Sequence, residues 1–174
     1  MADFLESKRL ILRRLKESDA KDIFYNYATD PDVTKYLTWN EHENINVTES
    51  LLRQWVKEDE NDYPNITRFG ITLKGQDSII GSIDLVKHGD DYEIGYVLSK
   101  KYWNKGYMSE ALELFLSYLK KLGYKKVPIT AQVSNIASNK VIQKMNGIFV
   151  AKEEIYLPLK NKNVQINSYF FDLK

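Results

Sequence analysis

The fold is decided by the segment Glu93-Ile94-Gly95-Tyr96-Val97-Leu98-Ser99-Lys100-Lys101-Tyr102-Trp103-Asn104-Lys105-Gly106-Tyr107-Met108-Ser109-Glu110-Ala111-Leu112. It begins as a strand, continues through a short basic loop and enters an amphipathic helix, which we predict over 106–122. The helix is indicated by apolar residues that recur at spacings of three and four, namely Met108, Ala111, Leu112, Phe115, Leu119 and Leu122. Gly123 is a typical stop signal after them.

The loop before this helix is a candidate phosphate site. The first turn of a helix presents free backbone N–H groups and the positive end of the helix dipole. Gly106 lets the backbone approach a ligand closely, and Lys105 adds positive charge. The alternative is an ordinary loop with a solvated lysine and a glycine chosen for its turn.

Hydrophobic periodicity and turn residues predict the elements around this segment. Strands are expected over 10–15, 66–74, 78–87, 91–99 and 127–133, with two more around 161–163, and helices over 18–28, 48–59 and 137–145. The strands between 66 and 99 should form an antiparallel meander, and one strand–helix–strand crossover follows. Pro128 weakens the prediction of a strand over 127–133, because proline removes a ladder hydrogen bond. Residues 38–47 are predicted to form a loop. The predicted fold class is α/β with a mixed, largely antiparallel sheet.

Length and composition limit the classes of function that are possible. The 174 residues fit one domain over 1–174, and 43% hydrophobic content excludes a disordered tail. The net charge of +1 lacks the basic excess typical of nucleic-acid binding. Zero cysteines exclude disulfides and a thiolate metal site. His42 and His88 sit in polar loops without a cluster of other metal-ligand residues around them, so no metal is expected. Without a signal peptide or membrane-length apolar run, we expect a cytoplasmic protein with no membrane partner.

A second constellation follows the strand at 127–133. Asn135 ends that strand, and Ser138 and Asn139 sit in the first turn of the next helix. Capping of this helix by Ser134 or Asn135 is a sufficient structural explanation. A binding role requires this segment and the first one to converge at the carboxyl ends of their strands, where α/β sheets bind ligands.

Taken together, these segments resemble the GNAT superfamily of N-acetyltransferases, and most of all its ribosomal-protein N-terminal (Rim-type) branch. The resemblance rests on the order and spacing of Arg9-Leu10-Ile11-Leu12-Arg13-Arg14-Leu15 with Asp19-Ala20, Ile80-Gly81-Ser82-Ile83, Glu93-Ile94-Gly95-Tyr96, Tyr102-Trp103-Asn104-Lys105-Gly106-Tyr107 with Glu110-Ala111, and Asn135-Ile136-Ala137-Ser138 with Lys144. It implies the GNAT fold with a splayed central strand pair, and acetyl-CoA as co-substrate.

The resemblance also implies a cofactor site. The pyrophosphate would be held by the backbone amides of Asn104, Lys105, Gly106, Tyr107, Met108 and Ser109. The pantetheine arm would bond the strand backbone at Tyr96, Val97 and Leu98, while Asn135 and Asn139 would contact the cofactor. Two residues depart from the family pattern: Asn104 replaces a usual glycine, and Met108 replaces a usual small residue.

Acetyl transfer to an amine needs three roles: a neutral amine, stabilisation of the oxyanion and help for the leaving thiolate. A backbone N–H near Val97 or Leu98 would serve the oxyanion, and Ser138 would donate to the sulfur. Glu93 is the predicted carboxylate that takes the proton through water, although a strand glutamate is more often simply a solvated alternate position. Two other carboxylates compete for that role, Asp84 and Glu153.

The sequence leaves the acceptor open. Tyr36 and Trp39 lie where relatives place the acceptor-side wall, and core packing would explain them equally well. We expect direct transfer to a primary amine, either a protein N-terminus or a small amine, because no cysteine and no Ser-His-Asp set offers an acyl-enzyme. The alternative is a CoA-binding regulatory module without turnover. A homodimer is compatible with these features.

Overall fold

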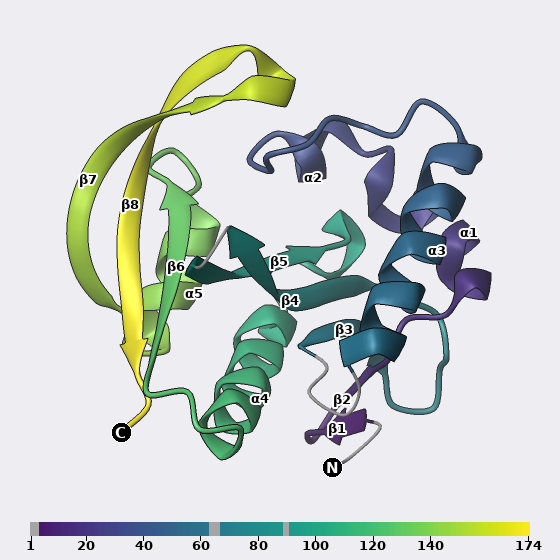
Figure 1. The fold of residues 1–174 in the computed structure, drawn as a ribbon, viewed down its shortest axis with the longest axis horizontal. Coiled ribbons are helices and arrows are strands. Elements are labelled where there is room, and N and C mark those ends of the chain that lie inside the picture. The colour runs from purple at the N-terminus through teal and green to yellow at the C-terminus, as the bar shows by residue number, and fades with distance from the viewer. Residues whose placement is uncertain (1–3, 63–66, 89–90) are drawn as a thin grey trace.

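The computed structural model describes residues 4–62, 67–88 and 91–174. Within them, eight strands form one sheet in the order β1-β2-β3-β4-β5-β6-β8-β7 (Figure 1). The strands are β1 (Phe4–Glu6), β2 (Leu10–Arg13), β3 (Arg68–Leu73), β4 (Gly81–His88), β5 (Asp91–Leu98), β6 (Lys126–Gln132), β7 (Ile148–Leu157) and β8 (Lys162–Asp172). All neighbouring pairs are antiparallel except β5 and β6, which are parallel. The predicted mixed, largely antiparallel sheet is therefore confirmed.

Helices cover both faces of the sheet. They are α1 (Ala20–Ile23), α2 (Pro31–Thr34), α3 (Ile45–Asp62), α4 (Tyr107–Lys121) and α5 (Ile136–Lys144). On one face, α4 and α5 pack apolar side chains such as Phe115 and Ile142 into the larger core cluster. On the other face, Ile23 and Leu52 of α1 and α3 join Val97 of β5 in a second cluster. The two clusters are separated by the sheet, as expected for side chains that alternate along each strand.

The N-terminal third differs most from the predictions. The single helix expected over 18–28 is a 3₁₀ turn (Glu17–Asp19), then α1, then a π-helical turn (Phe24–Ala28). The Asp30-Pro31 pair then starts α2, which was not predicted, because proline suits the first helical position and the Asp30 side chain accepts a hydrogen bond from the Asp32 N–H. Strand β1 was not predicted, and α3 begins at Ile45 inside the expected loop.

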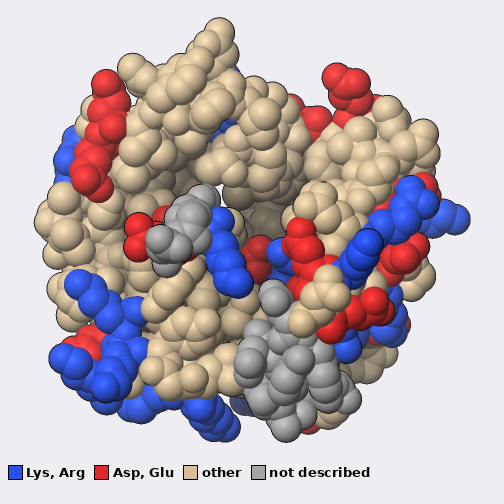
Figure 2. All heavy atoms as spheres, viewed as in Figure 1, with Lys and Arg blue, Asp and Glu red and all other residues tan. Residues whose placement is uncertain are grey.

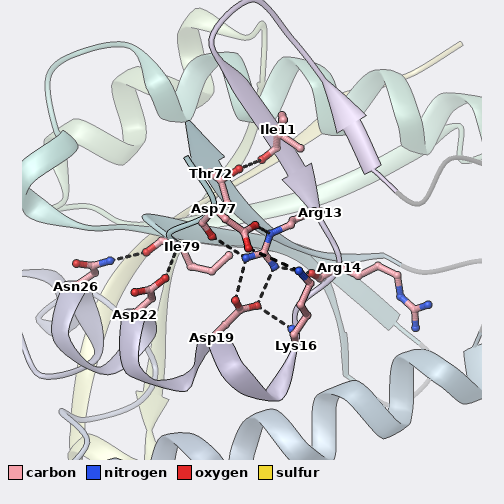
Figure 3. Close-up of polar contacts among 10 residues, drawn as sticks. All are labelled: Ile11, Arg13, Arg14, Lys16, Asp19, Asp22, Asn26, Thr72, Asp77 and Ile79. Atoms are coloured by element: carbon pink, nitrogen blue, oxygen red, sulfur yellow. Dashed lines mark hydrogen bonds and ion pairs between the residues drawn. The ribbon is translucent and has the colours of Figure 1, made fainter. Parts of the chain in front are cut away.

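An arginine-centred network fixes α1 beside the sheet (Figure 3). The Arg13 guanidinium donates to both carboxylate oxygens of Asp19 at 2.9 Å, and its Nε donates to Asp77 at 2.7 Å. Asp22 accepts a hydrogen bond from the Ile79 N–H at 3.0 Å. Strand β2, the turn into α1 and the loop before β4 are thereby tied together, which sets the position of the π-helical turn over the sheet.

The remaining predictions are largely confirmed. Strands β3, β4 and β5 form the expected meander, although Gly89 and Asp90 of the second turn lie outside the described residues. Pro128 is accommodated in β6 because β6 pairs with β5 at a single register position, so much of that edge requires no ladder hydrogen bond. In the described ranges, no helix is both long enough and apolar enough to span a bilayer.

Candidate active site

Strands β5 and β6 separate after one point of contact, which creates the splayed pair that the resemblance implied. Their parallel pairing is recorded only at Ile94 with Ile129, whereas β4 follows the other edge of β5 as far as Leu98. The backbone of Tyr96, Val97 and Leu98 thus has a β4 partner on one side and no β6 partner on the other. Free backbone donors and acceptors along a strand edge can bond an extended ligand.

The loop after β5 prepares the start of α4 for an anion. Asn104 and Gly106 both adopt positive φ, 59° and 76° respectively, and asparagine is among the few residues that tolerate this conformation. Gly106 occupies the N-cap position of α4 without any side-chain cap. The N–H groups of the first turn therefore have neither an acceptor within the helix nor a capping side chain. Met108 is 7% exposed, so its bulk lies in the core and leaves these amides open.

The turn between β1 and β2 supports this loop. Glu110 of α4 accepts hydrogen bonds from the Ser7 hydroxyl at 2.8 Å and from Arg9 Nε at 2.6 Å. Arg9 also donates to the Lys105 carbonyl at 2.9 Å and lies over the Tyr107 ring. Partial burial acts in the opposite direction, but the bonds from Ser7 and Arg9 lower the pKa of Glu110. Glu110 therefore stays ionised and holds the N-terminus of α4 in place.

The second constellation meets β5 through a pair of hydroxyls. The Tyr96 hydroxyl lies 2.8 Å from Ser138 Oγ, and either atom can be the donor. Burial raises the pKa of Tyr96 to about 12, partly offset by the bond to Ser138. Tyr96 therefore keeps its proton near neutrality. This hydroxyl was missed in the sequence, where only the Tyr96 backbone was expected to act, because 42 residues separate it from Ser138.

The cap of α5 is Asn135. Its side chain accepts a hydrogen bond from the Ser138 N–H at 3.2 Å, so the capping role does not fall on the Ser138 hydroxyl. Asn139 is buried, and its amide donates to the Gln132 and Asn135 carbonyls while its oxygen accepts from Tyr169 and Asn167. Three of these bonds fasten α5 to β6 and β8, and the bond to the Asn135 carbonyl lies within the start of α5 itself. A contact between Asn139 and the cofactor stays a prediction.

A cavity of about 720 Å³ opens on the face of the sheet that carries α3. Figure 2 shows the hollow between the two halves of the molecule, with acidic and basic side chains around it. The predicted site residues that line it are Tyr36, Trp39, Asp84, Glu93, Tyr96, Val97, Asn135 and Ser138. The loop 104–109 lies outside it, beyond the C-terminal end of β5. The site thus has two parts. One is the unpaired edge of β5 together with the start of α4, and the other is the cavity. Tyr96 and Ser138 lie where the two parts meet.

One wall of the cavity carries a charged cluster that was not predicted. Arg68 bonds Asp59 at 3.0 Å and Glu58 at 3.2 Å, and its guanidinium lies over the Trp55 ring. Its Nε lies 3.8 Å from a carboxylate oxygen of Asp84. Burial raises the pKa of Asp84 to about 6, against the lowering effect of Arg68. These residues lie on three different elements, and the β3–β4 register brings Arg68 opposite Asp84.

The other predicted carboxylates lie differently. Glu93 lines the cavity and accepts a hydrogen bond from the Thr130 hydroxyl at 3.3 Å. Glu153 is exposed on β7, where it accepts from Ser168, and it does not line the cavity. His42 pairs with the Thr48 hydroxyl at 2.7 Å. Across the described parts of the chain, no group of three or more His, Cys, Asp or Glu side chains is arranged to hold a metal ion.

The raised pKa of Asp84 should make the free energy of unfolding depend on pH. A folded-state pKa above the unfolded value of 3.8 means that the folded state binds the proton more tightly, so this group contributes most stability at low pH and loses it as pH rises through about 6. We expect Asp84→Asn to be more stable than the wild type at pH 7.5 by about 1–2 kcal/mol. This figure is smaller than the full pKa shift would give, because solvent reaches part of the Asp84 side chain and screens its charge. The difference should vanish near pH 4.

Urea unfolding across this pH range measures the effect. Asp91→Asn, at an exposed position on β5, controls for the change of surface charge. Equal stability of Asp84→Asn and the wild type at pH 7.5 would show that Asp84 carries no burial cost.

Residues 9–147 match the family model described as the acetyltransferase (GNAT) domain. The chain belongs to the GNAT acetyltransferase family. Membership makes it an acetyl-CoA-dependent acyltransferase. The chain is 33% identical over 144 residues to the uncharacterised N-acetyltransferase YnaD of Bacillus subtilis (strain 168), covering 81% of this chain and 80% of YnaD.

Solved GNAT structures share the fold. A GNAT-family acetyltransferase from Bacillus anthracis superposes with a TM-score of 0.81 at 26% identity, covering 98% of both chains. RimL, a ribosomal L7/L12 α-N-protein acetyltransferase solved in complex with coenzyme A, gives 0.81 at 18% identity and covers 98% of this chain and 99% of its own. The latter likeness concerns the fold alone.

Proposed function

We propose that this GNAT protein moves the acetyl group of acetyl-CoA directly to a primary amine, either a protein N-terminus or a small amine, that enters the cavity on the α3 face. The observation that carries the proposal is the junction of Tyr96 and Ser138, because it joins the free edge of β5 to the cavity. A thioester laid along that edge and an amine held in the cavity would meet there.

The residues present fit acetyl-CoA. The first-turn amides of α4, reached through Asn104, Lys105 and Gly106, would hold the pyrophosphate together with Tyr107, Met108 and Ser109. The free β5 edge at Tyr96, Val97 and Leu98 matches an extended pantetheine arm. When bound, acetyl-CoA supplies an acetyl group activated as a thioester. Asn135 and Asn139 are proposed to support the same site from the start of α5.

The chain's own groups supply the remaining chemistry. A backbone N–H of Val97 or Leu98 donates to the acetyl oxygen, where negative charge develops. Ser138 donates a hydrogen bond to the leaving sulfur, while the Tyr96 hydroxyl, 2.8 Å away, keeps its proton and orients Ser138 by donating to its Oγ. Glu93 and its rival Asp84 both line the cavity as candidate proton acceptors, and Tyr36 and Trp39 are proposed to form the acceptor wall. Within this proposal the protein belongs to the Rim-type branch, which the resemblance supports, and it acts in the cytoplasm, which the absence of cysteine supports.

Release of free thiol from acetyl-CoA tests the proposal. The acceptors would be butylamine, spermidine, an aminoglycoside and a peptide with a free N-terminal serine, with the N-acetylated peptide as its matched control. We expect release with at least one free amine and none with the blocked peptide. A rise in melting temperature with acetyl-CoA but no release with any amine would favour the CoA-binding regulatory module. Sedimentation of the same preparation would measure the predicted homodimer.

A further inference from the structure

The charged wall of the cavity contains the Asp84 carboxylate, which can still accept hydrogen bonds from a ligand. Among the described residues, neither oxygen of Asp84 has a hydrogen-bond donor, and the nearest cation is Arg68 Nε at 3.8 Å. Arg68 Nε is itself buried without a hydrogen-bond partner in the described structure. A carboxylate accepts several hydrogen bonds, so this one retains most of its capacity for a donor from a ligand.

The space in front of Asp84 is kept open by Gly95. The two residues are cross-strand neighbours in the β4–β5 register. A Cβ on Gly95 would lie 3.0 Å from Asp84 Oδ1 and 3.1 Å from Val86 Cγ2, which is tighter than ordinary contact. Asp84 Oδ1 therefore lies against the backbone of Gly95, which carries no side chain. Gly95 lines the cavity and lies two residues before Val97. The open space beside Asp84, called the recess below, exists because the strand register places a glycine opposite this carboxylate.

The groups that face this recess come from several elements. The titratable side chains that line the cavity here are Tyr27 from the π-helical turn, Glu58 and Asp59 from α3, Arg68 from β3 and Glu93 from β5, with Tyr36, His42 and Lys87 elsewhere on its lining. Arg68 is shared among Glu58, Asp59 and Asp84, so this wall carries an excess of negative charge. An acidic recess beside aromatic walls attracts a cation rather than an anion.

We propose that the acceptor's ammonium group sits over Gly95 and that Asp84, rather than Glu93, takes its proton. The inference rests on the proposed function and names the proton acceptor for it. One N–H bond of the ammonium breaks, its electron pair stays on nitrogen, and the proton forms an O–H bond on Asp84. The neutral amine then uses that pair to form the new C–N bond, and the C–S bond breaks with its electron pair on sulfur. The second proton that the nitrogen loses ends on that sulfur as the free thiol, and Asp84 returns its own proton to solvent after the product leaves.

The pH profile of kcat/KM separates Asp84 from its rival. With the best amine of the panel, the wild type should fall tenfold per pH unit below about pH 6, where Asp84 becomes protonated. Between pH 6 and the pKa of the amine, the rate should be flat. Asp84→Asn should be ~100-fold slower at pH 7.5 or worse. Its remaining rate should rise tenfold per pH unit, because it depends on neutral amine from solution.

Glu93→Gln is the matched variant. We expect it to be slower by less than about tenfold and to keep the flat region, because a base other than Glu93 takes the proton. Loss of the flat region in Glu93→Gln together with its retention in Asp84→Asn would overturn the proposal. Gly95→Ala should raise KM for the amine and leave KM for acetyl-CoA unchanged, since the added Cβ fills the recess.

A titration that needs no turnover keeps the inference separate from the proposed function. The carboxyl carbon of Asp84, followed by NMR, should titrate near pH 6 in the free protein. Butylamine, present as the ammonium ion, should lower that midpoint, whereas butanol should not. An unchanged midpoint with butylamine would contradict the ammonium site even if the enzyme acetylates amines. A lowered midpoint without thiol release from any amine would contradict the proposed function alone.

Discussion

Gly106→Val should weaken acetyl-CoA binding by about 10- to 100-fold, seen as a nearly lost rise in melting temperature with ligand. Gly106 has φ of 76°, and a β-branched residue is strained in that conformation. The valine would therefore displace the first-turn amides of α4, and its side chain would stand where the pyrophosphate should approach. Both effects act on the edge of the site rather than on its cavity.

Two further variants identify which effect matters. Gly106→Asn keeps a residue that tolerates positive φ, as Asn104 does two positions earlier, so it should bind more tightly than the valine variant. Lys105→Ala should weaken binding only by about threefold or less, because an exposed charge is screened by salt. Equal and negligible losses for Gly106→Val and Lys105→Ala would remove this loop from the site.

Ser138→Ala should lower turnover by ~100-fold, roughly 3 kcal/mol, with cofactor affinity little changed. Its hydroxyl matters most when charge develops on sulfur, and the alanine variant leaves Tyr96 without its partner at 2.8 Å. Stability should hardly change, because the cap of α5 is the Asn135 side chain, which bonds the retained Ser138 N–H. Steady-state rates and melting would be measured on the same preparation.

The neighbouring residues provide controls for this prediction. Asn135→Ala should lower stability by about 1 kcal/mol through loss of the cap. Tyr96→Phe should slow turnover, and the double variant with Ser138→Ala should cost less than the sum, because the two hydroxyls act as one pair. A fully active but less stable Ser138→Ala variant would show that this serine is a structural residue.

The sequence predicted the elements whose signals are local. The apolar stripe of α4, its stop at Gly123 and the meander of β3 to β5 depend on spacing within each segment, and all are present. Helix α2, which begins at Pro31, and the π-helical turn at Phe24–Ala28 were not predicted, because proline both ends and begins helices and a π turn has no periodicity of its own.

The candidate site was predictable only where a motif carried it. The loop before α4 and the start of α5 were found because each combines special residues at a helix N-terminus. The cluster around Arg68 was missed, because Asp59 and Asp84 reach it from a helix and a neighbouring strand. Their meeting depends on strand register and helix packing, which no single stretch of sequence contains.

The most direct test of the account is the change in backbone amide NMR signals when coenzyme A is added. If the free edge of β5 and the start of α4 form the cofactor site, the amides of Val97, Leu98 and residues 104–109 should shift most. Those of Phe149 and Val150, exposed on the edge strand β7, should stay in place. Binding that shifts other amides and leaves both 97–98 and 104–109 unchanged would contradict the account.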